Sequence, residues 1–243
     1  MAGLNAGDQR FAGDDGKPDP GVAAILARYA AGQEAEQAAL AALAGTRLLL
    51  PLVERAPADL TDADAQHAHA CGAAGPAAGR EMALPTLVGR DGRPALLAFT
   101  SLDALTRWRP DARPVPALAA QVFQTAVADS CAVVIDLAGP VPLAVDGARL
   151  GALARGEPPP APQDDPDVHA QITEALAGEP AIASAELARG TAGTDLAVRL
   201  IIRPRATPPP DVQHVAEAIA ARLAGRLRRG IEVAAVPAPR VRR

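Results

Sequence analysis

Aromatic residues are almost absent from this chain of 243 residues, which has one Trp, one Tyr and three Phe, 2% of the total. Hydrophobic residues nevertheless make up 49% of the sequence, so its cores must be built from Ala, Leu, Val and Ile. The length allows one large domain or two of ordinary size, and either buries enough apolar surface to fold without disulfides or metal ions.

Long apolar runs are also missing. The longest, such as residues 48–53, cover a few positions, whereas a membrane-spanning helix needs roughly 18. Residues 1–16 are polar and acidic and contain no apolar signal-peptide core. Of the two cysteines, Cys71 lies in a polar segment and Cys131 opens an apolar one, so no disulfide framework is expected. We therefore expect a cytoplasmic protein that does not enter a membrane.

Lysine is nearly absent as well, since Lys17 is the only one, and we attribute the preference for arginine to coding bias. Residues 196–243 carry ten Arg against three acidic residues, a net charge of +7, which leaves −11 on residues 1–195. A basic end is compatible with nucleic acid or an acidic partner. Residues 196–243 contain no Trp, Tyr or Phe for base stacking, however, so a solvated helix face with a basic tail is the better interpretation, and no nucleic-acid partner is expected.

Proline marks the clearest boundary. The segment EPPPAPQDD (157–165) excludes helix and central strand and is predicted to be a stiff linker. The fold class predicted is α+β, with two small domains in which helices pack on a mixed or antiparallel sheet. The predicted divisions are a disordered tail at 1–20, an N-terminal domain at 21–156 with a flexible loop at 54–79, the linker, a C-terminal domain at 166–237 and a basic tail at 238–243.

Periodicity and turn residues predict the elements of the N-terminal domain. Helices are expected near 22–29 and 33–44, followed by a strand at 46–53 in which Pro51 favours an edge or a bulge. A β-hairpin is expected from MALPTLVG and PALLAF around Asp91 and Gly92. Further along we expect a short helix that is capped at Thr100 and Ser101 and reaches Leu105. After a Pro-punctuated stretch at 110–116, a helix is expected over 118–127 with Pro116 near its start. Strands at 131–137 and 141–145 and a short helix from Gly147 to about Gly156 follow.

The C-terminal domain has a simpler pattern. Apolar residues predict a helix from Val168, a strand at 181–187, an alternating strand at 196–202, a helix capped by Asp211 and a final strand at 231–236. The order α-β-β-α-β suits a small layer of helices on one sheet.

Three stretches resemble a known family. They are EMALPTLVGRDGRPALLAFTSLDALTRWRPDARPVP (81–116), RFAGDDG (10–16) and VVIDLAGPVPLAVDG (133–147). The first closely resembles the signature of the SseB family, the enhanced serine sensitivity proteins, and the others are similar to its actinobacterial members. The resemblance covers most of residues 10–155, and the C-terminal part looks like the partner domain often found behind it. It implies two α+β domains and no mechanism, because the family is named for a growth phenotype.

Two candidate sites involve cysteine. His67, His69 and Cys71 form H-x-H-x-C, but a structural zinc site normally has four ligands and no second cluster exists, so a flexible polar insertion is favoured and no metal or other cofactor is expected. Cys131 is a possible nucleophile, yet it opens the apolar run AVVI without an adjacent base, which favours a buried structural thiol.

Other constellations are weaker still. Ser101 and Ser130 lack a nucleophile elbow, so capping and turn roles are expected. The glycines at 89–92 and 190–193 do not have the spacing of phosphate-binding loops. The paired carboxylates at 14–15 and 164–165 lie in segments expected to be mobile, whereas acid–base catalysis needs carboxylates held in a shaped cleft.

Arg107, Trp108 and Arg109 form the one exceptional cluster, because the only tryptophan follows a short helix between two guanidinium groups. Trp and Arg are the residue types most enriched at binding hot spots. Alternatively, Trp108 covers the edge of the hairpin sheet. No catalytic set is recognisable, so we expect a non-enzymatic protein that binds another protein or a small metabolite. The rival hypothesis is an enzyme or enzyme accessory linked to serine or sulfur amino-acid metabolism, and Cys131 or the His67–His69 pair would carry its chemistry.

Overall fold

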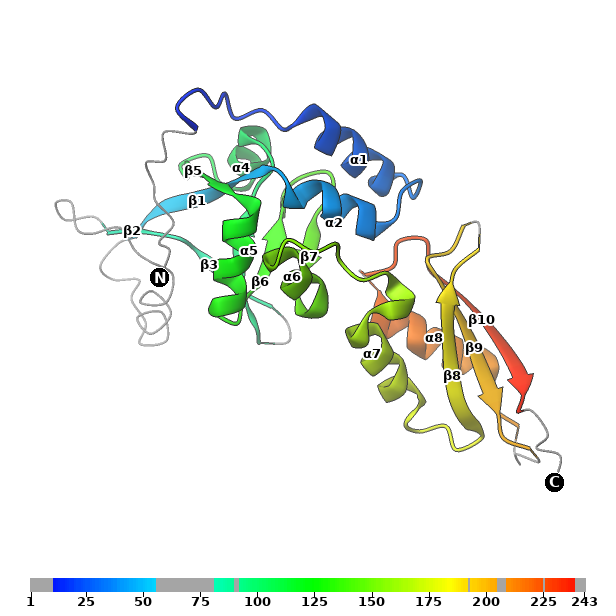
Figure 1. Ribbon diagram of the computed structural model, residues 1–243. Coiled ribbons are helices and arrows are strands. Elements are labelled where there is room, and N and C mark those ends of the chain that lie inside the picture. Colours follow the sequence, from blue (N-terminus) through cyan, green and yellow to red (C-terminus); the bar gives the residue numbers. More distant parts are fainter. Residues whose placement is uncertain are drawn as a thin grey trace. The chain divides into compact units, whose positions relative to one another are not determined.

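The computed structural model describes residues 11–55, 81–89, 92–191, 193–204, 209–224 and 226–238. The chain divides into two compact units. The first consists of the described residues up to Ala31 together with Ala38–Pro159, and the second of Gly32–Gln37 together with the described residues from Pro160 onward. Helices pack on mixed or antiparallel sheets in both units, which confirms the α+β class (Figure 1).

Two sheets form the framework of the first unit. The helices along this part of the chain are α1 (Pro20–Ala30), α2 (Glu36–Ala44), α4 (Leu102–Trp108), α5 (Ala119–Ala128) and α6 (Gly147–Ala154). The strands are β1 (Arg47–Arg55), β2 (Glu81–Ala83), β3 (Thr86–Val88), β4 (Pro94–Ala98), β5 (Arg113–Leu118), β6 (Ala132–Ile135) and β7 (Leu143–Val145). One sheet has the antiparallel order β2-β1-β5, and the other has the order β3-β4-β6-β7 with β4 and β6 parallel. Leu49 and Phe99 join the sheets by two backbone hydrogen bonds of 2.8 Å each.

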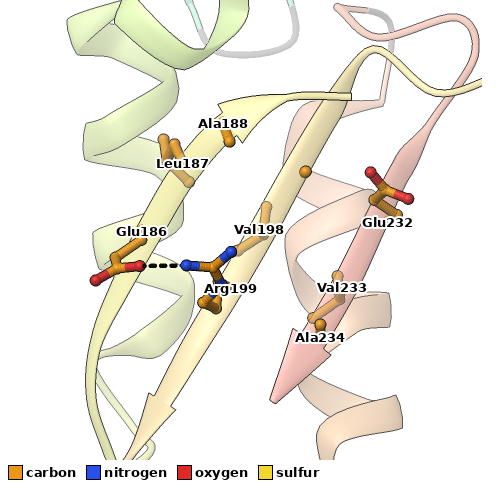
Figure 2. A pocket seen from close by; sticks show the side chains of 9 residues that line it. Glu186, Leu187, Ala188, Val198, Arg199, Glu232, Val233 and Ala234 are labelled. Carbon is orange, nitrogen blue, oxygen red and sulfur yellow. Dashed lines mark hydrogen bonds and ion pairs between the residues drawn. The ribbon is translucent and has the colours of Figure 1, made fainter. Parts of the chain in front are cut away.

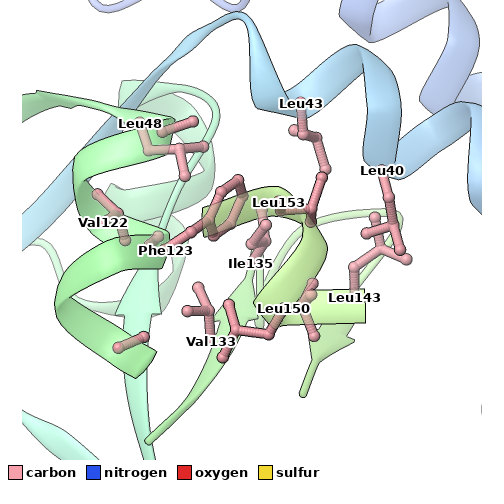
Figure 3. Packing of buried hydrophobic residues seen from close by; sticks show 14 of the residues in the cluster. Leu40, Leu43, Leu48, Val122, Phe123, Val133, Ile135, Leu143, Leu150 and Leu153 are labelled. Atoms are coloured by element: carbon pink, nitrogen blue, oxygen red, sulfur yellow. The ribbon is translucent and has the colours of Figure 1, made fainter. Parts of the chain in front are cut away.

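The strands of the first unit bury apolar side chains on both faces. Along β4, Leu96 and Ala98 enter the main core, while Leu97 and the following Phe99 enter a small core on the opposite face. Figure 3 shows Phe123 of α5 pointing into the main core. The small core is covered by α4 and comprises Leu49, Val53, Leu97, Phe99, Ala104, Leu105 and Ala112. α4 therefore lies across the sheet from α5 and α6, as Figure 1 shows.

Prolines of β5 account for one difference from the sequence-based expectation. No strand was predicted in the Pro-punctuated stretch at 110–116, but Arg113–Leu118 is a strand, and α5 begins only at Ala119. Pro114 and Pro116 lie opposite β1 residues whose backbone groups point away from β5. The N–H that each proline lacks would thus point out of the sheet, and β5 tolerates this because it is an edge strand.

Pro51 was expected to place its strand at an edge or a bulge, but β1 is the central strand of its sheet. On the side of β1 away from β5, the neighbours are Phe99, opposite Leu49, and β2, whose last residue lies opposite Val53. Pro51 lies between these two contacts, so no neighbour requires its missing N–H.

The predicted hairpin is present, although its first strand is shorter than expected. β3 and β4 are antiparallel, and Gly92 of the turn has a φ of +77°, the conformation for which glycine was expected there. Met82 belongs instead to β2, which pairs with β1. The continuous apolar pattern of MALPTLVG therefore spans two strands of different sheets.

The second unit is a single sheet with helices packed on one face. Its elements are a 3₁₀ turn (Pro162–Asp164), α7 (Pro166–Leu176), β8 (Ile182–Arg189), β9 (Leu196–Ile202), α8 (Val212–Leu223) and β10 (Ile231–Pro237). β9 is central, antiparallel to β8 and parallel to β10. The core joins one face of this sheet to both helices through Val168, Ile172, Leu196, Val198, Leu200, Val215, Ile219 and Leu223.

Candidate functional site

Trp108 is the last residue of α4. The helix begins after Ser101, whose hydroxyl oxygen accepts a hydrogen bond from the backbone N–H of Ala104 at 3.1 Å, so the expected capping role is confirmed. α4 continues three residues beyond the expected end at Leu105. The Trp108 ring lies against Phe99 with 5.6 Å between ring centroids and an interplanar angle of 33°.

Two other half-buried apolar side chains pack against the small core to which Trp108 contributes. Leu87 of β3 and Val134 of β6 pack against the same small core as Trp108, and all three are only partly covered. Trp108 thus contributes to the sheet's packing and also presents part of its surface to solvent. We refer to Leu87, Arg107, Trp108, Arg109 and Val134 together as the Trp108 surface.

The two arginines beside Trp108 are exposed. Nε of Arg109 donates a hydrogen bond to Oδ1 of Asp111 at 3.0 Å, and this bond lowers the pKa of the Asp111 carboxyl. Because both side chains are open to solvent, the ion pair is weak. Arg107, Trp108 and Arg109, the three predicted site residues, thus combine an apolar ring with positive charge at the end of α4.

A buried carboxylate holds the turn from which α4 starts. Asp136 follows β6 and accepts hydrogen bonds from the backbone N–H of Thr100 at 2.8 Å and from its hydroxyl at 2.6 Å. Asp136 is 4% exposed and has a φ of +52°. Burial raises the pKa of this carboxyl, and the hydrogen bonds from Thr100 oppose the rise. Thr100 directly precedes the helix cap Ser101, so Asp136 positions α4.

Arg47, the first residue of β1, holds the same turn through a second set of contacts. Its Nη1 donates to the backbone oxygen of Thr100 at 2.6 Å, and its Nη2 donates to the backbone oxygen of Lys17 at 2.7 Å. Nη2 and Nε also donate to the two carboxylate oxygens of Asp14. The hydrogen bonds from Arg47 lower the pKa of Asp14. Although Asp14 was expected in a mobile segment, the structure gives its carboxylate a fixed partner.

Cys131 does not have the environment of a nucleophile. The residue is 7% exposed, and its Sγ lies 3.4 Å from the backbone oxygen of Asp129. Burial, and to a lesser extent the charge of Asp129, raises the pKa of the thiol, whereas a reactive cysteine needs a lowered pKa. The preceding Ser130 has a φ of +55° and forms a turn, in keeping with the role expected for it.

The H-x-H-x-C sequence of His67, His69 and Cys71 lies outside the described residues, so the interpretation of this segment stays a prediction. Within the part of the chain that the structure describes, His, Cys, Asp and Glu side chains form no group of three able to hold a metal ion. In the same part, every helix is too short or too polar to cross a bilayer.

Acidic residues within the second unit take up much of its positive charge. Ion pairs join Arg222 to Glu174 at 2.8 Å, Arg229 to Asp195 at 2.8 Å and Arg226 to Asp165 at 3.4 Å. Asp165, expected in a mobile pair of carboxylates, is 2% exposed and caps α7 by accepting a hydrogen bond from the N–H of Asp167. Glu174 and Asp165 thus join α7 to α8 and the segment after it, whereas Asp195 holds the turn before β10.

Comparison with known proteins identifies the first unit. The family model for the SseB protein N-terminal domain matches residues 22–152, more than half of the chain. The chain belongs to the SseB family. Neither the curated proteins nor the solved structures include a match. The family match ends before Pro160, where the larger part of the second unit begins. For the residues from Pro160 onward the resemblance to a partner domain stays a prediction, as does the actinobacterial type.

The supporting residues of the SseB domain were not identified from sequence. Asp136 and Thr100 are 36 positions apart, and Arg47 and Asp14 are 33 positions apart, so no local sequence motif predicts either contact. An aspartate ending a buried apolar strand was the only available signal, because it places a carboxylate where the chain leaves the core.

Proposed function

We propose that this SseB-family protein is a non-enzymatic binding protein whose first unit recognises a protein partner through the Trp108 surface. The observation that carries the proposal is the single tryptophan, half-buried on the small core and flanked by the exposed Arg107 and Arg109. Large rings and guanidinium groups supply most of the energy at many protein interfaces. The partner suited to this corner presents an apolar side chain next to a carboxylate.

The rigidity of the corner also supports the proposal. Asp136, Arg47 and Ser101 together fix the start of α4 through hydrogen bonds to the turn and the helix. A side chain already held in its binding conformation loses little conformational entropy on association, so the surface is preorganised.

The rival enzymatic hypothesis gains no support from Cys131. That hypothesis requires a thiol with a lowered pKa, and burial shifts the pKa of Cys131 in the opposite direction. Its other requirement, a metal at His67 and His69, falls outside the described residues.

The test of this proposal avoids truncating Trp108. Replacing a largely packed Trp by Ala costs about 3 kcal/mol or more through lost packing, so lost binding could simply reflect unfolding. A photo-cross-linking amino acid is therefore introduced at position 107, which is exposed, and in a second variant at position 189, an exposed arginine of the second unit. Both variants are irradiated in the native cells, and the adducts are identified by mass spectrometry.

We expect one reproducible protein adduct from position 107 that is absent from position 189. To test the charge, the cross-linker is placed at a neighbouring position such as 103, and Arg107→Glu is added to the same chain. This substitution should reduce the adduct severalfold, because it places an acidic group against an acidic partner. Identical adducts from 107 and 189, or none from 107 above background, would overturn the proposal.

A further inference from the structure

The second unit leaves one face of its sheet uncovered by its helices. Side chains alternate along each strand, and the face that carries Leu196, Val198 and Leu200 packs against α7 and α8. The opposite face carries Glu186 and Ala188 of β8 and Arg199 of β9, all exposed (Figure 2). A hollow of about 640 Å³ runs along this face.

The pairing of β8 with β9 arranges this face in rows. Glu186 lies opposite Arg199, Ala188 opposite Ala197, and Ser184 opposite Ile201. Nη1 of Arg199 donates to Oε2 of Glu186 at 3.1 Å, and the two side chains are 61% and 59% exposed. On β8 and β9 the central row thus holds one positive and one negative charge, and the row beside it holds two alanines. Glu232 of β10 continues this second row next to Ala197, outside the β8–β9 pair.

This charge pattern is complementary to itself. A two-fold axis can run parallel to the strands, halfway between two stacked sheets and above the line midway between β8 and β9. Rotation about this axis places β9 of the second copy over β8 of the first, while each row of side chains still faces the same row. Each Glu186 then faces the Arg199 of the other copy, and Ala188 faces Ala197. An axis over β9 would instead bring Arg199 against itself, so the charges select the first arrangement.

We propose that this face is a self-association surface, on which two copies of the chain stack their β8–β9 sheets through a quartet of Glu186 and Arg199 side chains. The alanines leave room for the backbones to approach to the roughly 10 Å typical of stacked sheets. The solvent-exposed ion pair within one copy is weak, so each side chain is able to bond its counterpart in the other copy as well.

The size of the face sets the expected strength. Two strands per copy cover less than the roughly 800 Å² per partner that stable complexes bury, so the dimer is weak and depends on concentration. Its attraction is mainly electrostatic, so added salt dissociates it. The surface lies in the second unit and involves none of the residues of the Trp108 surface. Either proposal can therefore be refuted without affecting the other.

Charge reversal combined with mixing tests the proposal. Sedimentation velocity of the full chain is measured at low salt from about 5 to about 500 µM, the range in which small interfaces associate. Glu186→Arg places four positive charges in the quartet and Arg199→Glu four negative ones, and each should weaken self-association at least about tenfold. An equimolar mixture of the two variants should associate again, because each copy then offers the charge that the other lacks. Restoration on mixing also shows that both variants are folded.

The matched control is Glu174→Arg. Glu174 and Arg222 form a similar exposed ion pair at 2.8 Å, but they join the two helices rather than the strands. This variant changes the net charge as Glu186→Arg does and should associate like the original chain. A strictly monomeric chain up to the highest concentration, failure of the mixture to associate, or an equal loss in Glu174→Arg would each overturn the proposal.

Discussion

The buried carboxylate of Asp136 leads to a prediction with an unusual sign. Its pKa in the folded protein is raised by burial above the ordinary value of 3.8. Protonation therefore favours the folded state, and this stabilisation is complete below the ordinary pKa and is lost as the pH rises through the folded pKa. At neutral pH the ionised carboxylate costs stability, although it accepts two hydrogen bonds from Thr100.

Two substitutions separate the charge of Asp136 from its hydrogen bonds. In Asp136→Asn the amide oxygen still accepts from the N–H of Thr100, and the amide nitrogen donates to the hydroxyl, which then acts as acceptor. Asn also tolerates the φ of +52°. We expect this variant at pH 7 to lie within about 1 kcal/mol of the original chain, or above it. Asp136→Ala leaves the buried N–H and hydroxyl of Thr100 unsatisfied and should lose about 3 kcal/mol.

Urea unfolding followed by tryptophan fluorescence measures these differences, because the single tryptophan, Trp108, reports on the unit that contains Asp136. As the pH is lowered from neutral towards the ordinary aspartate pKa of 3.8, the original chain should gain stability relative to Asp136→Asn, because its raised pKa lets the buried carboxylate take up a proton sooner than in the unfolded chain. An asparagine variant as unstable as the alanine variant at pH 7, or an original chain that loses stability relative to Asp136→Asn on acidification, would refute the reasoning.

Other contacts of the SseB domain make further predictions. Arg47→Ala should destabilise the first unit by about 1–3 kcal/mol, since it removes the hydrogen bonds that Arg47 donates to Asp14, Thr100 and Lys17, and should make residues 11–19 sensitive to limited proteolysis. In a Cys71→Ser background, Cys131 should react with a thiol reagent at pH 7 only after denaturant is added, because burial raises its pKa; rapid labelling of the native protein would contradict this. Ser101→Ala should cost about 1 kcal/mol in urea unfolding through loss of the α4 cap, whereas Ser101→Asp should retain most of it.

Local signals in the sequence predicted most of the elements. The Asp-Gly turn placed the β3–β4 hairpin, and the Ser101 cap placed the start of α4, because in both cases the determining contacts lie within a few residues. The alternation at 196–202 likewise predicted β9, along which Leu196, Val198 and Leu200 are buried and Arg199 is exposed. Patterns of this kind are local and therefore visible in one sequence.

Long-range pairing decided the features that the sequence did not reveal. Whether Pro114 and Pro116 break a strand depends on which side of that strand is bonded, and only the partner strand settles this. The partners of Asp14 and Asp136 lie more than thirty residues away. Local composition alone suggested mobility for Asp14, because a Gly- and Asp-rich segment contains no sign of the arginine that holds it.

The candidate site was partly predictable for the same reason. Composition identified Trp108 and its two arginines because a single tryptophan is conspicuous in so aliphatic a chain. Its stacking on Phe99 and its share in the small core depend on the pairing of Phe99 with Leu49, which joins the two sheets. That share shows why Trp108→Ala alone would be an ambiguous test of binding.

The central claim, recognition of a protein partner through the Trp108 surface, is tested most directly by quantitative co-purification from the native cells. Three tagged baits are compared by mass spectrometry: the original chain, Arg107→Glu and Arg189→Glu, the last two altering exposed arginines of different units. The account predicts a protein that is retained by the original chain and by Arg189→Glu and is depleted severalfold by Arg107→Glu. The same set of proteins at the same levels on all three baits would contradict it.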